Sequence, residues 1–167
     1  NGARRRDAAA LLQRARAERA DLEAREAALR SIVEECVRRV DPAPRYAVPD
    51  TAALGQVPNT RDELETFLRR LDQVSRAMAI AQTAYSKALQ DHSELDSRLE
   101  AYHAKATTKG VAEVADVAQA YQLARGALDE RPSRMLLAQQ LVAVYQTYLQ
   151  TTPAPRAAHQ ATSAEEA

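Results

Sequence analysis

The stretch Leu64–Tyr102, LETFLRRLDQVSRAMAIAQTAYSKALQDHSELDSRLEAY, decides the fold of this chain. Its apolar residues alternate three and four positions apart, which places one narrow stripe on a helix and requires a partner helix to cover it. No Gly or Pro interrupts the run. A helix of about 45 residues would be roughly 65 Å long, which exceeds the usual globular length. We call the stripe the ladder; its two rows are Leu64, Leu71, Met78, Tyr85, His92 and Leu99, and Phe67, Val74, Ala81, Ala88, Leu95 and Tyr102.

The composition of the 167-residue chain favours an all-α fold. Ala, Leu, Glu and Arg are abundant, and no run alternates Val, Ile and Thr as a strand would. The formal net charge is zero, so no overall field attracts nucleic acid or an anionic membrane. No apolar stretch reaches the roughly 18 to 20 residues that span a bilayer. The single cysteine, Cys36, excludes an internal disulfide and fits a reducing, cytoplasmic compartment.

Four helices, a proline-rich connection and a tail account for the whole chain. Thr60 and Glu63 have capping-box spacing, which predicts that the second helix begins there. Residues 41–59 contain four Pro and cannot be helical throughout. We expect them to form a strap along the helices, with a recognition loop as the alternative. The predicted helices cover residues 5–40, 60–106, 111–129 and 133–150, and the composition of 151–167 is typical of a disordered tail.

Apolar rows also run along the first and third predicted helices. They give each of these helices a face to bury against a neighbour. Gly126, inside the third helix, is interpreted as a close-packing site. The row of the first helix is Ala8, Ala15, Leu22, Leu29 and Cys36, and that of the third is Val111, Val114, Ala118, Tyr121 and Leu128.

The helix predicted at 133–150 is apolar on two sides. Such a helix is either buried between neighbours or keeps one face for a partner. Its second row is offset from the first by two residues, which predicts that it lies on nearly the opposite side. The first row is Met135, Ala138, Val142, Tyr145 and Leu149, and the second is Leu137, Leu141, Val144 and Tyr148.

These elements predict an all-α, elongated antiparallel helical bundle formed by residues 1–150 as a single domain. The first two helices would form a long, coiled-coil-like helical hairpin bridged by the strap, and the shorter C-terminal helix pair would cover part of the second helix. Because that pair is less than half as long as the second helix, part of the ladder should remain uncovered. We therefore expect an interface with a protein partner, or with a second copy in a homodimer, at Leu64, Leu71, Met78, Tyr85, Leu137, Leu141, Val144 and Tyr148.

Residues that could carry chemistry are few. Glu100 and His103 have the E-x-x-H spacing of di-iron bundles, but that chemistry needs a second such pair, which the sequence lacks. His92 lies on the ladder itself, and we interpret it as a buried polar residue that fixes register. A metal site with Asp96 or a pH-sensitive contact are the alternatives. We expect no enzymatic activity, no metal and no cofactor.

The run Arg4, Arg5 and Arg6 is compatible with a phosphate contact, with a position beside a membrane segment outside this chain, or with a solvated helix start. Nucleic acid is not an expected partner, since no aromatic platform or phosphate loop accompanies the run. The sequence predicts a non-enzymatic protein–protein interaction module: a scaffold, adaptor or oligomerisation domain acting through coiled-coil or helix-in-groove packing. The alternative is the soluble sensory or signal-transmitting domain of a membrane-anchored protein.

Overall fold

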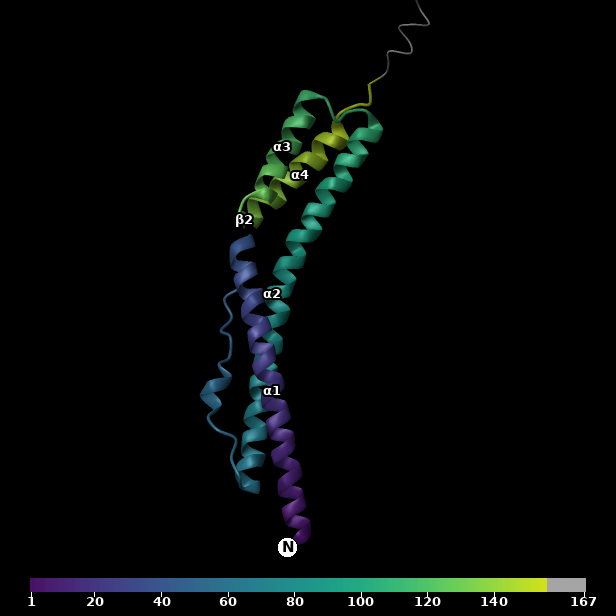
Figure 1. The fold of residues 1–167 in the computed structure, drawn as a ribbon. Helices are drawn as coiled ribbons and strands as arrows, with labels where there is room; N and C mark the ends of the chain where they lie inside the picture. The colour runs from purple at the N-terminus through teal and green to yellow at the C-terminus, as the bar shows by residue number, and fades with distance from the viewer. Residues whose placement is uncertain (156–167) are drawn as a thin grey trace, which may run out of the picture. The chain divides into compact units, whose positions relative to one another are not determined.

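The computed structural model describes residues 1–155 and confirms that this part of the chain is predominantly α-helical (Figure 1). Of the predicted tail, residues 156–167 lie outside the described part. Two short strands pair in parallel, with Val40 opposite Ser133. The elements are α1 (Gly2–Arg39), β1 (Val40–Asp41), a 3-10 helix at Thr51–Leu54, α2 (Arg61–Lys109), α3 (Ala115–Asp129), β2 (Ser133–Arg134) and α4 (Met135–Thr151).

The chain divides into two compact units, which are described separately. The first comprises Asn1–Arg38 and Ala43–Ala88, so it holds α1, the strap and the first part of α2. The second comprises Arg39–Pro42 and Leu89–Ala167, so it holds the last part of α2, both strands, α3 and α4.

In the first unit, α1 and α2 lie side by side and run in the same direction (Figure 1). Early α1 residues such as Leu11 share a groove with early α2 residues such as Leu68. Further along both helices, Arg25 Nη1 donates to Ser75 Oγ at 2.7 Å. The predicted antiparallel hairpin is therefore wrong. About 18 residues of extended strap span roughly 60 Å, which is enough to carry the chain back along α1 before α2 begins.

The strap packs against both helices of this unit. Tyr46 N–H donates to Tyr85 Oη at 3.2 Å, and that hydroxyl donates to Tyr46 O at 3.0 Å. Thr51 N–H donates to Glu26 Oε1 at 2.7 Å. This hydrogen bond, more than the neighbouring Arg30, lowers the pKa of the Glu26 carboxyl. Through these contacts the strap is hydrogen-bonded to α1 at Glu26 and to α2 at Tyr85.

The first row of the ladder is buried over its whole length within one copy of the chain. In the first unit, α1 lies alongside the ladder and buries its own row there, Ala15, Leu22, Leu29 and Cys36. In the second unit, α3 and α4 share a core with ladder residues Leu95 and Leu99. The expectation of uncovered ladder followed from the lengths of α3 and α4 alone, whereas α1 covers the ladder of the first unit. The prediction of an uncovered stretch at Leu64, Leu71, Met78 and Tyr85 is therefore wrong.

Both ends of α2 follow backbone rules that the sequence predicts. At the start, Glu63 N–H donates to Thr60 Oγ1 at 3.4 Å. At the end, Gly110 has φ +80° and its N–H donates to Thr107 O at 3.1 Å, while Val111 N–H donates to Ala106 O at 3.0 Å. This pair of bonds is a Schellman motif, which needs the left-handed conformation that Gly adopts without strain. The motif turns the chain from α2 into α3.

In the second unit, α3 runs antiparallel to the end of α2 and α4 runs parallel to it. Arg125 of α3 contacts Asp96, whereas the earlier residue Tyr121 contacts the later residue Glu100. At the far end, Lys109 Nζ donates to Leu149 O at 2.8 Å and so caps α4.

The buried face of α3 differs from the predicted row. The structure buries Val117, Ala120, Ala124, Ala127 and Leu128 and leaves Val114 exposed. The predicted row preferred Val and Tyr to Ala as buried residues. Small Ala side chains are buried instead, because they allow neighbouring helices to approach closely. Gly126 lies outside this face, and a Cβ added there would meet no other atom within 4 Å. Its interpretation as a close-packing site is wrong.

Gly126→Ala should therefore raise the free energy of unfolding by about 0.5–1 kcal/mol, since Gly is costly inside a helix and the added methyl group has open space. Urea denaturation of the wild type and the variant measures the difference. A loss of stability would show that the methyl group meets an atom after all.

Leu71→Ala should lower the free energy of unfolding by about 2–5 kcal/mol, because it opens a cavity in a fully buried row. Ile80→Ala, on the same helix but 59% exposed, is the matched control and should change it by less than about 0.5 kcal/mol. Thermal and urea unfolding report both values. Equal losses at the two positions would contradict the burial of the ladder.

Candidate protein-interaction surface

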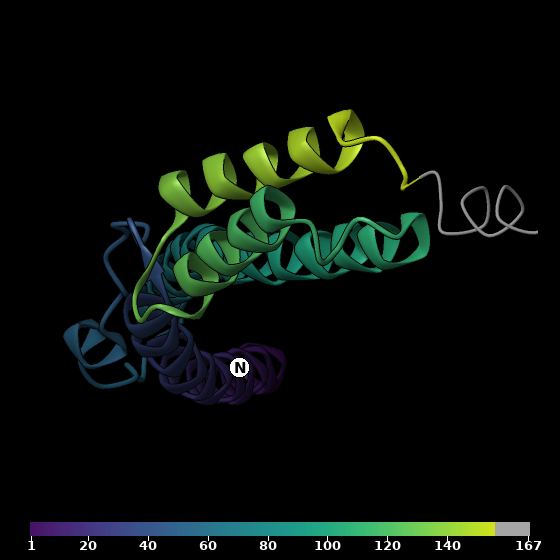
Figure 2. The same cartoon turned by 90° about the horizontal axis from the view of Figure 1, so that it is seen from above.

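The helix α4 has no charged residue in its 17 positions, MLLAQQLVAVYQTYLQT. Its buried face is the predicted first row, with Ala138, Val142, Tyr145 and Leu149 packed in the core of the second unit. α4 lies beside α3 and forms an edge of this unit (Figure 2). The remaining faces of α4 meet solvent without any charged side chain of their own.

The second row of α4 flanks the buried face on the side of α3. Leu137 and Leu141 are half-buried, while Val144 is 45% and Tyr148 42% exposed. The predicted position opposite the core is therefore wrong. Leu141, Val144 and Tyr148 each stand one residue before a buried residue of the first row, and one residue is a step of about 100° around a helix, so the second row lies beside the buried face. The row nevertheless stays at least partly accessible to solvent.

A groove of about 240 Å³ runs between α3 and this row. From α3 it takes Leu123, which is 54% exposed and which sequence reasoning missed. The sequence held one signal for Leu123. It follows Asp116 and Ala120 at spacings of four and then three residues, which places the three on one face of a helix. We call this the α3–α4 groove; it is lined by Asp116, Gln119, Ala120, Leu123, Leu141, Val144 and Tyr148.

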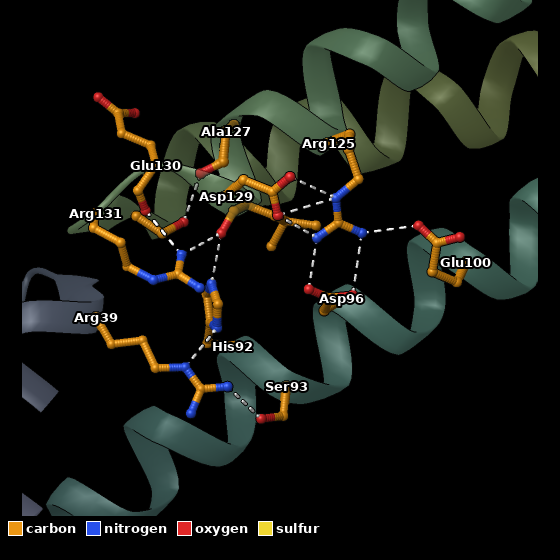
Figure 3. A network of polar contacts seen from close by, with 12 residues as sticks. Arg39, His92, Ser93, Asp96, Glu100, Arg125, Ala127, Asp129, Glu130 and Arg131 are labelled. Carbon is orange, nitrogen blue, oxygen red and sulfur yellow. Dashed lines mark hydrogen bonds and ion pairs between the residues drawn. The ribbon is translucent and has the colours of Figure 1, made fainter. Parts of the chain in front are cut away.

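An ion-pair network holds α3, and hence one wall of the groove, against α2 (Figure 3). Arg125 makes two parallel hydrogen bonds to Asp96, at 3.1 and 2.6 Å, and a third bond of 2.8 Å to Glu100. It also pairs with Asp129 on its own helix at 2.8 Å. The guanidinium lowers the pKa of the Asp96 carboxyl, and the acids raise the pKa of Arg125. Such a two-pronged pair fixes orientation as well as distance.

His92 is buried where α2 meets the end of α3 (Figure 3). Its Nδ1 accepts from Arg39 Nε at 3.1 Å, and its Nε2 lies 3.0 Å from Leu128 O. The Arg39 guanidinium can only donate a hydrogen bond, and the Leu128 carbonyl oxygen can only accept one. The ring is therefore neutral with its proton on Nε2. Burial lowers the pKa of His92, and the nearby Arg39 and Arg131 lower it further. His92 is thus a buried polar residue of the ladder with a polar partner at each ring nitrogen.

Polar contacts also hold the turn between α3 and α4. Arg131 Nη1 donates to Leu128 O at 2.7 Å, so this carbonyl serves both Arg131 and His92. Ser133, fully buried, donates its hydroxyl to Ala127 O at 2.8 Å. Together these contacts set the position at which α4 begins beside α3.

The other candidate residues lie in packing contacts or on the surface. Glu100 accepts from Tyr121 Oη at 2.8 Å, and His103 stacks on the Tyr121 ring at 4.1 Å. Within residues 1–155, no group of three or more His, Cys, Asp or Glu side chains is arranged to hold a metal ion. Cys36 is buried, which raises the pKa of its thiol. The predicted basic run, Arg4, Arg5 and Arg6, lies exposed at the start of α1.

No helix in the described part of the chain is both long enough and apolar enough to cross a membrane. Comparison of the chain with protein-family models, with curated proteins and with solved structures found no match in any of the three. A functional proposal therefore depends on the geometry of the surface.

The free energy of unfolding should fall as the pH is lowered from about 7.5 to about 5.5. The pKa of His92 is lower in the folded chain than in the unfolded chain, where it is near 6.5, so the unfolded chain binds more protons over this range. His92→Gln should flatten the dependence, because Gln does not titrate. Urea denaturation at several pH values measures the slope.

Ile80→Gln, an exposed change on the same helix that leaves every titratable group in place, is the matched control and should keep the wild-type pH dependence. If His92→Gln retained the full slope instead, His92 would not be the group responsible.

Proposed function

We propose that this chain is a non-enzymatic protein-association module whose contact surface is the α3–α4 groove together with the exposed side of α4. The observation that carries the proposal is that α4 has no charged residue even though part of it faces solvent. Its exposed apolar residues are Leu136, Val144 and Tyr148. A helix that faces only water normally carries charged residues on its outer side. Interface cores, in contrast, are depleted in charge and enriched in aromatic residues.

The shape of the surface supports helix-in-groove packing. A partner helix that enters the groove would meet Leu123 on one wall and Val144 and Tyr148 on the other. Asp116 at one end supplies a charged rim. An apolar centre with a polar rim is the usual anatomy of a specific protein interface.

The preformed scaffold also favours association. The groove walls are held by Arg125 on α3 and by the His92 and Ser133 contacts at the turn before α4. A partner would therefore meet side chains that are already ordered, which lowers the entropic cost of binding.

The first unit has a structural role in this proposal. Buried positions recur every seven residues on both α1 and α2, which we interpret as coiled-coil packing within the chain. Leu64, Leu71, Met78 and Tyr85 serve that internal packing, so the contact surface consists of the second-unit residues Leu137, Leu141, Val144 and Tyr148, with Leu123 added.

Site-specific photo-crosslinking tests the proposal. A benzophenone amino acid replacing Val144 in the full chain should give a light-dependent adduct to protein, because that position would lie within an interface. The same amino acid at Ile80, which is exposed on the first unit, is the matched control and should give none. Leu123→Lys on the opposite wall should abolish the adduct at position 144. An absence of adducts at 144, or equal adducts at 80, would contradict the proposed surface.

A further inference from the structure

We propose that the α3–α4 groove is occupied by a second copy of this chain, in a two-fold symmetric dimer in which α4 packs antiparallel against α4 of the other copy. The inference rests on the proposed function and names its partner. Spacing, absence of charge and the charges at the ends of the face each support it.

The spacing of the second row of α4 reads the same in both directions. Leu137, Leu141, Val144 and Tyr148 are separated by four, three and four residues. A two-fold axis passing midway between Leu141 and Val144 places Leu137 opposite Tyr148 of the second copy. It also places Leu141 opposite Val144 of that copy. A two-fold interface requires such a self-complementary patch, because both copies contribute the same surface.

The lack of charge on α4 removes the usual obstacle to pairing a helix with itself. In a symmetric dimer, charged side chains near the axis meet their own like, and like charges at an interface are costly. The exposed side of α4 between Leu136 and Thr151 offers only apolar, amide and hydroxyl groups. The second copy can therefore approach along the full helix without burying an unpaired charge.

Charges at the two ends of the face select the antiparallel orientation. Asp116 lines the groove at its Tyr148 end. Arg134, the N-cap of α4, lies three residues before Leu137 at the other end. Antiparallel pairing brings Arg134 of one copy towards Asp116 of the other, whereas parallel pairing brings like charges together. Arg134 already pairs with Glu130 at 3.2 Å, but its side chain is 59% exposed and its guanidinium has further donors.

Sedimentation velocity of the full chain over a range of concentrations tests the occupant. The wild type should form dimers, and Val144→Lys should weaken the dimer by about 100-fold, because it places two like charges near the axis. Ile80→Lys, a change at an exposed position of the first unit, should leave the dimer constant unchanged. Circular dichroism verifies that each variant is folded. A wild-type chain that is monomeric at every concentration would overturn the inference. A dimer dissociation constant that Val144→Lys leaves unchanged would overturn it as well.

A charge exchange tests the orientation. Asp116→Arg and Arg134→Asp should each weaken the dimer by roughly threefold to tenfold, since each replaces an attraction with a repulsion. The double variant should recover most of the wild-type dimer constant. Single variants that do not weaken the dimer would contradict antiparallel packing.

The two proposals fail in different ways. A monomeric chain that still crosslinks from position 144 to a different protein would overturn the second copy as occupant and leave the association surface standing. A monomeric chain without adducts at position 144 would overturn both.

Discussion

Burial of the ladder on α2 is the constraint on which both units depend. The row from Leu64 to Leu99 follows one face of a single uninterrupted helix, and exposing its apolar residues to water would be costly. Within the first unit, α1 covers this face with a row of its own spaced every seven residues. Within the second, α3 and α4 cover it with a core of small and branched side chains. The remaining features of each unit follow from how the chain reaches these covering positions.

The strap makes the parallel pairing of α1 and α2 possible. Two helices joined by a short turn must run antiparallel, whereas a long extended connection can return the chain to its starting end. The strap is held on the way by the paired hydrogen bonds of Tyr46 and Tyr85 and by Thr51 on Glu26. Its prolines, which forbid helix over this stretch, therefore serve the topology of the first unit.

Polar groups supply orientation where apolar packing alone would leave it loose. Arg125 joins α3 to two acids on α2, and His92 links Arg39 to the Leu128 carbonyl. Each buried polar group in these contacts has a partner, so hydrogen bonds offset most of the free energy lost when these groups leave water. The result is a fixed α3–α4 pair whose outer groove has apolar walls and one charged residue, Asp116, at its rim. Rigid support beneath an apolar face is what an association surface requires.

Much of the fold could be predicted from residue order because it depends on local chemistry. The seven-residue period determined that α2 is a long helix, Thr60 marked its start, and the prolines of residues 41–59 marked the strap. The second row of α4 identified Leu137, Leu141, Val144 and Tyr148 as accessible apolar positions, since periodicity on one helix is visible in sequence.

Only the tertiary structure decided which helix covers which part of the ladder. Periodicity shows that a face must be buried, but it carries no information on the direction or identity of the covering helix. For this reason Leu64 and Tyr85 changed from expected interface residues to core residues once α1 was found to cover this part of α2. The same limit explains why Leu123 was missed. A single Leu on α3 gains meaning only when α4 lies beside it and completes the groove.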